Sequence, residues 1–93
     1  MVTIEEENAL YTILELFPPP FYEEDMSTIL LCGELRQFLR ENDLTGKTVR
    51  ITGPLTNAQF LVAGIELANK CSIVKVLSWD KTKWIRCYAN WDF

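Results

Sequence analysis

Two short polar segments in the second half of the chain have the residue types that bind an anion. Residues 52–57 supply a glycine for close backbone approach and a hydroxyl and an amide near the predicted start of a helix. Residues 78–83 supply two hydroxyls, a carboxylate and two ammonium groups. Phosphate prefers backbone N–H donors at a helix start together with cationic side chains. The candidate ligand-binding residues are Gly53, Thr56, Asn57, Ser78, Asp80, Lys81 and Lys83.

These residues would divide the recognition of a small phosphorylated nucleotide among them. We expect the Gly53 amide, Thr56 and Asn57 to hold phosphate, and Lys81 and Lys83 to neutralise its charge. Asp80 would hydrogen-bond a ribose or a base, with Ser78 beside it. The alternative interpretation is that Thr-Gly-Pro-x-Thr is a turn followed by a capped helix, because the motif matches neither GxGxxG nor the phosphate-loop pattern.

The chain has no histidine. This removes the commonest general base and the commonest transition-metal ligand. Asp80 is the one acid in the two candidate segments, so no carboxylate pair is available there for acid–base chemistry. The sequence therefore predicts no metal or other cofactor and identifies no catalytic residue, and any turnover would depend on how the ligand is positioned.

The elements that would position this site alternate between strand and helix. We expect strands at residues 47–52 and 72–77 and a closing antiparallel strand at 83–88. Thr56 and Gln59 have the spacing of a capping box, so a helix should start there. The predicted buried face of that helix consists of Phe60, Leu61, Gly64, Ile65 and Ala68. Strand–helix–strand units make their two strands parallel, which brings residues 52–57 and 78–82 to the same rim of the sheet.

The first half of the chain contains a second predicted helix, preceded by a segment that fits either a strand or a helix. Asp25 or Ser27 can cap a helix whose apolar stripe is formed by Leu31, Leu35, Phe38 and Leu39, and Gly33 in that helix suggests close packing. Residues 10–17 favour a strand, although residues 3–17 also fit a helix with a capping box at Thr3 and Glu6. The predicted fold is α+β, a ferredoxin-like βαβαββ sheet with two helices on one face. The alternative has residues 3–17 helical and three helices on a three-stranded sheet.

Charge is divided sharply along the chain. Residues 1–45 carry ten acidic and two basic side chains, whereas residues 46–93 carry three acidic and seven basic ones. The acidic excess opposes binding to duplex nucleic acid. It favours docking of the first half on a basic protein partner or on the basic half of another copy, so we expect a homo-oligomer or a protein complex.

Length and composition predict one α+β domain over residues 1–93 in the cytoplasm. No apolar run reaches the roughly 20 residues of a membrane span. Cys32, Cys71 and Cys87 have no CxxC spacing and lie in apolar runs, so we expect buried free thiols.

The order of segments resembles that of a known family. A β-rich segment (YTILELF), a proline connector, a helix, a strand ending in Thr-Gly (VRITG), a helix rich in small residues, a strand with an aspartate turn (VKVLSWD) and a closing strand (WIRCY) follow one another over residues 10–88. This layout is similar to that of small ferredoxin-like CRISPR-associated ring nucleases. The resemblance implies binding and degradation of cyclic oligoadenylate, assembly as dimers or larger, and manganese dependence in some members.

Within that resemblance, Gly53 and Asp80 occupy motif positions. The chain departs from the family in lacking the histidines near its site, and in having Leu55–Asn57 where a Pro-x-Trp-like element would follow the glycine. Two hypotheses therefore stand. The first is a nucleotide-signal-binding module, a cyclic oligoadenylate binder or a ring nuclease acting by ligand positioning. The second is a non-enzymatic interaction or regulatory domain, such as an inhibitor or an assembly subunit, that docks through its acidic half.

Overall fold

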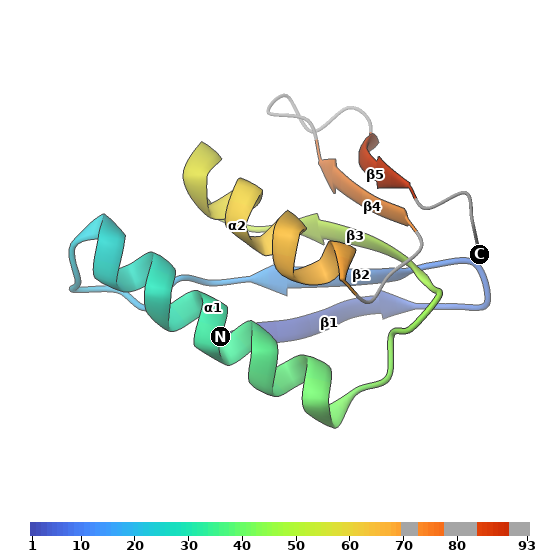
Figure 1. Ribbon diagram of the computed structural model, residues 1–93, viewed down its shortest axis with the longest axis horizontal. Helices are drawn as coiled ribbons and strands as arrows, with labels where there is room; N and C mark the ends of the chain where they lie inside the picture. Colours follow the sequence, from blue (N-terminus) through green and yellow to red (C-terminus); the bar gives the residue numbers. More distant parts are fainter. Residues whose placement is uncertain (70–72, 78–83, 90–93) are drawn as a thin grey trace.

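The computed structural model describes residues 1–69 and the backbone of residues 73–77 and 84–89. The elements are β1 (Val2–Glu7), β2 (Thr12–Leu16), α1 (Glu24–Glu41), β3 (Thr48–Thr52), α2 (Asn57–Ala68), β4 (Ile73–Leu77) and β5 (Trp84–Ala89). The strands form one sheet in chain order, and Figure 1 shows both helices on one face of it. The predicted α+β class is confirmed.

The sheet is mixed. Strands β2, β3 and β4 are parallel, and the connections between them run through α1 and α2. Strands β1 and β5 lie at the two edges and are antiparallel to their neighbours. The predicted parallel pairing of the strands on either side of α2 and the antiparallel return of the last strand are both confirmed.

The chain begins with a β-hairpin. The Asn8 side-chain oxygen accepts hydrogen bonds from the backbone N–H groups of Leu10 (2.8 Å) and Tyr11 (3.0 Å), which closes the turn between β1 and β2. Residues 12–16 are a strand, as favoured, and the helical alternative for residues 3–17 is wrong. Strand β1 was not predicted, so the observed order ββαβαββ has one strand more at its start than the expected βαβαββ.

The core lies between the helices and one face of the sheet. Burial alternates along β3, where Val49 and Ile51 are buried and their neighbours are partly exposed, as expected for a strand with one covered face. The core residues of the described elements are Leu14, Leu16, Leu31, Leu35, Leu44, Val49, Ile51, Ala63 and Leu67. The predicted stripe of α1 is confirmed, since Leu31 and Leu35 are buried and Phe38 and Leu39 pack against the same cluster.

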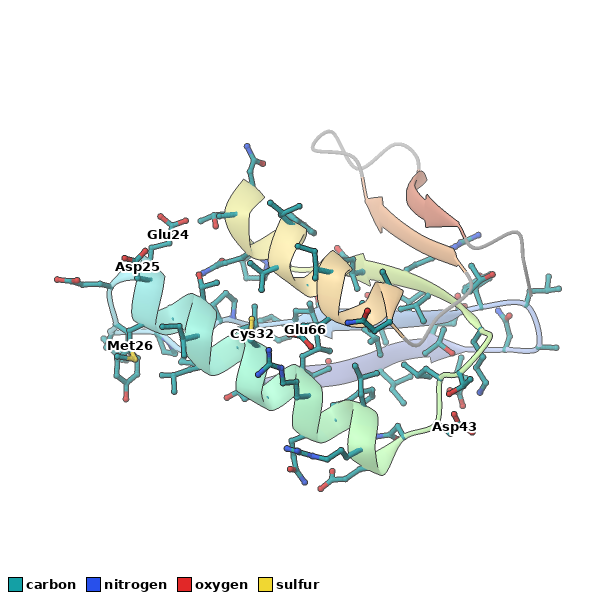
Figure 2. All side chains as sticks on the ribbon, in the orientation of Figure 1. Glu24, Asp25, Met26, Cys32, Asp43 and Glu66 are labelled. Carbon is teal, nitrogen blue, oxygen red and sulfur yellow. The ribbon has the colours of Figure 1, made fainter. Side chains whose placement is uncertain are left out.

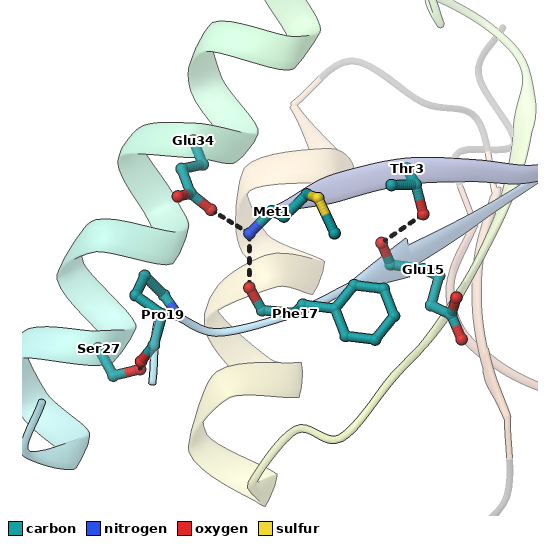
Figure 3. A network of polar contacts seen from close by, with 7 residues as sticks. All are labelled: Met1, Thr3, Glu15, Phe17, Pro19, Ser27 and Glu34. Carbon is teal, nitrogen blue, oxygen red and sulfur yellow. Dashed lines mark hydrogen bonds and ion pairs between the residues drawn. The ribbon is translucent and has the colours of Figure 1, made fainter. Parts of the chain in front are cut away.

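Helix α1 starts earlier than predicted. Its N-cap is Glu23, whose side chain makes no capping hydrogen bond, and both Asp25 and Ser27 lie inside the helix. The acidic first turn suits the positive end of the helix dipole, which allows the earlier start. The Ser27 hydroxyl instead donates to the Pro19 carbonyl oxygen (2.9 Å), as Figure 3 shows, and fastens α1 to the proline connector.

The predicted buried face of α2 is wrong at Leu61 and Ile65, although Phe60 does pack against the core cluster. The buried positions are Gln59, Ala63 and Leu67, whereas Leu61 and Ile65 are 65% and 56% exposed. Helix α2 is apolar on nearly every side, so periodicity alone cannot orient it. The close packing expected at Gly33, and the close approach to the sheet expected at Gly64, are also wrong, because a Cβ atom at either position would meet no atom within 4 Å.

The two helices contact each other directly. The Arg36 guanidinium forms an ion pair with the Glu66 carboxylate at 2.6 Å, and this contact raises the pKa of Arg36. Cys32, a free thiol that is only half-buried, lies at the same contact, and Figure 2 shows it with Glu66 between the helices. Burial raises the pKa of the Cys32 thiol, and the nearby Glu66 charge adds to this. Cys71 and the side chain of Cys87 lie outside the described residues.

Candidate functional site

Gly53 has a structural role at the end of β3. Its φ of +134° is a backbone conformation that glycine adopts readily, and a Cβ atom there would lie 2.1 Å from the Leu16 carbonyl oxygen. The loop after β3 therefore passes against the backbone at the end of β2. This contact explains why glycine is needed here without a ligand.

Thr56 is engaged by its own helix. Its hydroxyl oxygen accepts the Gln59 backbone N–H (3.2 Å), and the Gln59 side-chain oxygen accepts the Thr56 N–H (3.1 Å). The predicted capping box is confirmed. Asn57, the first residue of α2, is exposed. The capped-helix interpretation of this segment thus accounts for Thr56.

The other predicted rim residues, Ser78, Asp80, Lys81 and Lys83, lie outside the described residues. What the structure supplies is the placement of the strands before them. Strands β3 and β4 are parallel, with Ile51 opposite Val76, so the segments that follow Thr52 and Leu77 leave the sheet at the same end.

Three basic residues share one row across the sheet. The register places Arg50 of β3 opposite Lys75 of β4, and Lys75 opposite Arg86 of β5. The Arg50 guanidinium also lies 3.8 Å from the centroid of the Tyr11 ring, and the Tyr11 hydroxyl donates to Glu6 (2.7 Å). Strand positions, rather than the rim, thus hold a large part of the positive charge of the second half.

A groove lies on the opposite side of the molecule, between β1 and α1. Its volume is about 670 Å³. One wall is the start of β1, at Met1 and Val2, and the other is a face of α1 that bears Ile29, Leu30 and Phe38. We call it the β1–α1 groove. Figure 1 shows that the second half of α1 extends past the β1 edge.

The apolar side chains that form the walls of the groove are exposed to solvent. Ile29 is 64% exposed and Leu30 is also exposed, although both belong to a helix that buries its other stripe. Gly33 lies between them and Phe38, and no neighbouring atom approaches the position of its missing Cβ.

Acidic residues stand around these apolar walls. Glu34 and Glu41 line the groove, and Glu34 pairs with the Met1 ammonium group, which also donates to the Phe17 carbonyl oxygen (Figure 3). Glu41 accepts a hydrogen bond from Gln37 (2.7 Å), and Gln37 in turn accepts one from Arg40 (3.0 Å).

More acids lie at the two ends of this side of the molecule. Glu5, Glu6 and Glu7 continue along β1 and are exposed, and Figure 2 shows Glu24 and Asp25 at the start of α1. The acidic half predicted from the sequence is thus a surface that surrounds an apolar groove.

The sequence reasoning missed this groove. Its signal was present in Ile29 and Leu30, which do not belong to the stripe of Leu31, Leu35, Phe38 and Leu39 and so give α1 a second apolar stripe. Without knowledge of β1, nothing indicated what lay beside that stripe.

No family model, curated protein or solved structure matches this chain. Within residues 1–69 and the two later strands, no three cysteine or acidic side chains gather where a metal ion could bind. None of the helices described here combines the length and the apolar character that crossing a bilayer requires.

Proposed function

We propose that this protein is a non-enzymatic interaction module, an inhibitor or an assembly subunit, that docks a basic protein partner in the β1–α1 groove. The observation that carries the proposal is the combination of exposed apolar walls at Ile29 and Leu30 with the carboxylates of Glu34 and Glu41 at the same groove. Contiguous apolar surface with a polar rim is typical of protein interaction sites.

Charge favours a basic partner. The first 45 residues carry ten acids against two bases, and the acids lie on the elements that form the groove and on those next to it. Complementary charge raises the rate of encounter and selects among partners, and it acts over a range of about 8 Å at physiological salt. Binding should therefore weaken as salt is raised.

Photo-crosslinking tests the site in cells of the source organism. Benzoylphenylalanine replaces Ile29 in one variant and Leu61 in the control, because both side chains are exposed apolar residues on helices but only Ile29 lines the groove. We expect a discrete crosslinked protein at position 29 that disappears with Leu30→Asp and in high salt. Equal crosslinking at both positions, or none at position 29, would refute the proposal.

A second function is favoured by the parallel pairing of β3 and β4. In this proposal the rim formed by residues 52–57 and 78–83 binds a nucleotide signal such as cyclic oligoadenylate, in a domain related to the ferredoxin-like ring nucleases. Because the Thr56 hydroxyl oxygen caps α2, the Gly53 amide, Asn57, Ser78, Asp80, Lys81 and Lys83 would make the contacts.

A thermal-shift titration with mononucleotides and cyclic oligoadenylates tests this second function. Binding should raise the melting temperature of the native chain, and the double variant Lys81→Glu/Lys83→Glu should lose that response because it reverses the charge at the rim. Ile29→Asp is the matched control and should bind like the native chain. Unchanged affinity in the double variant would exclude this rim.

A further inference from the structure

The free edge of β1 shows how a partner can enter the groove. Strand β1 is the first strand of the sheet and pairs with β2 alone among the described strands. An edge strand leaves a row of backbone N–H and C=O groups without sheet partners. In the present structure this row runs along the wall of an apolar groove.

The hydrogen-bond pattern shows which groups point outward. Met1 and Phe17 exchange two backbone hydrogen bonds, from Met1 N to Phe17 O (2.5 Å) and from Phe17 N to Met1 O (2.8 Å). In an antiparallel pair, hydrogen-bonded and non-bonded residue pairs alternate. The register pairs Val2 with Leu16, Thr3 with Glu15 and Ile4 with Leu14. The backbone groups of Val2 and Ile4 therefore point away from β2.

The accessible part of the edge is short and well defined. The register shifts between Ile4 and Glu6, and the strand ends in three glutamates. Irregular pairing and charged side chains are the features that protect sheet edges from another strand. They protect the end of β1, whereas its start, up to Ile4, pairs regularly with β2, and Met1 and Val2 line the groove.

Helix α1 already covers the place that a sixth strand would occupy. Neighbouring strands lie about 4.8 Å apart, and beyond β1 the next structure on the helix side is the face of α1 with Ile29, Leu30 and Gly33 (Figure 1). Alternate side chains of an added strand would point toward this face. No atom lies within 4 Å of the position of the missing Cβ of Gly33, so one of these side chains can approach the helix backbone there.

We propose that the partner segment is an extended basic peptide that pairs with Val2 and Ile4 of β1 and inserts alternate apolar side chains into the β1–α1 groove. Its lysine and arginine side chains alternate with the apolar ones and point to the opposite face of the sheet, and the exposed Glu5–Glu7 at the end of β1 attract them. The inference rests on the proposed interaction function and adds the conformation and chemistry of the bound segment.

Two other occupants fit less well. A helix would fill the apolar groove but would leave the outward backbone groups of Val2 and Ile4 without partners, whereas strand addition satisfies them. A second copy pairing through its own β1 would bring two runs of Glu5–Glu7 and two acidic α1 helices together, which is electrostatically unfavourable.

The test uses a fluorescein-labelled decapeptide of alternating lysine and valine, measured by fluorescence anisotropy at low and high salt. Ile4→Pro removes one outward N–H, and Ile4→Ala is its control because it shortens the same side chain but keeps that N–H. Neither Ile4 nor its replacement lines the groove. Circular dichroism verifies that both variants are folded. If Ile4→Pro does not fold, a chain in which an ester replaces the backbone amide of Ile4 removes the same N–H group.

We expect the peptide to bind the native chain and Ile4→Ala, with exchange protection of the Val2 and Ile4 amides. Loss of one backbone hydrogen bond should weaken binding by about tenfold in Ile4→Pro or in the ester. Binding that is unchanged in these backbone variants but lost in Ile29→Asp would overturn strand addition while leaving groove docking intact. Preference for a helical lysine–leucine peptide, or absence of binding by the extended one, would also overturn it.

Sedimentation velocity of the chain alone completes the test. Pairing of two copies through their β1 edges is not expected, because the acidic edges repel one another. A dimer that Ile4→Pro dissociates would assign the β1 edge to a second copy and overturn the choice of partner.

Discussion

Helices α1 and α2 cover the same face of one sheet, and both expose apolar residues, but those of α1 line a groove together with the edge strand β1. Leu61 and Ile65 of α2 are about as exposed as Ile29 of α1. The α2 residues belong to the helix that packs over interior strands and β5, whereas Ile29 and Leu30 line a groove with the start of β1. Exposed apolar side chains thus indicate a candidate site only where the neighbouring surface forms a groove with them.

The largest expected effect separates the two stripes of α1. Leu35→Ala removes a fully buried side chain from the core and should lower the free energy of unfolding by about 3 kcal/mol. Leu30→Ala, on the groove side, should change it by less than about 1 kcal/mol. Urea denaturation measures both. Similar losses in the two variants would show that the groove stripe is part of the core.

Alanine substitutions of Gly53 and Gly33 should change the stability of the fold in opposite directions. Gly53→Ala places a Cβ against the Leu16 carbonyl at a positive φ and should cost about 2 kcal/mol. Gly33→Ala meets no atom and favours the helix, so it should stabilise by up to about 1 kcal/mol. Thermal unfolding of both variants distinguishes these signs, and a destabilised Gly33→Ala would mean that the groove is filled in solution.

The N-termini of the two helices offer a smaller contrast. Thr56→Ala breaks the capping box of α2 and should cost about 1 kcal/mol. Glu23→Ser gives α1 the side-chain cap that it lacks and should raise the free energy of unfolding by roughly 0.5 kcal/mol. Chemical denaturation of both variants tests the pair. A neutral Thr56→Ala would contradict the assignment of its hydroxyl to helix capping.

The smallest effect concerns the contact between the helices. Burial raises the pKa of the Cys32 thiol above that of an unfolded chain, so the folded state retains the proton longer than the unfolded state does. Stability should therefore decrease as pH rises from about 7 to about 10, and less so in Cys32→Ala. Urea midpoints at the two pH values report the difference. An equal pH response in both chains would assign the effect to other groups.

Local sequence signals were sufficient to predict most of the helices and strands. They were insufficient to predict how these elements pack against one another. Thr56 and Gln59 predicted the start of α2 correctly, because a capping box depends on four consecutive residues. Strand β1 escaped prediction because VTIEEE lacks a sustained alternation and gains its conformation from pairing with β2. The orientation of α2 escaped because an all-round apolar helix takes its rotation from packing, as Ala63 and Leu67 show.

The candidate site shows the same limit more strongly. Gly53 and Thr56 were assigned to a ligand from residue type, yet the Leu16 carbonyl and the Gln59 amide explain both. The groove could not be found because it needs β1, which the sequence did not indicate. Ile29 and Leu30 can be recognised as part of a groove only through a strand that is 22 residues or more away in the chain (29 − 7 = 22).

The order of the strands in the sheet has an electrostatic consequence. Because spatial order follows chain order, the division of charge along the sequence becomes a gradient across the width of the sheet. Glu5–Glu7 lie on one edge strand, Arg50 on the middle strand, and Lys75 and Arg86 on the last two. The molecule is therefore an electric dipole, and the field of a basic partner would rotate it during approach so that β1 arrives first.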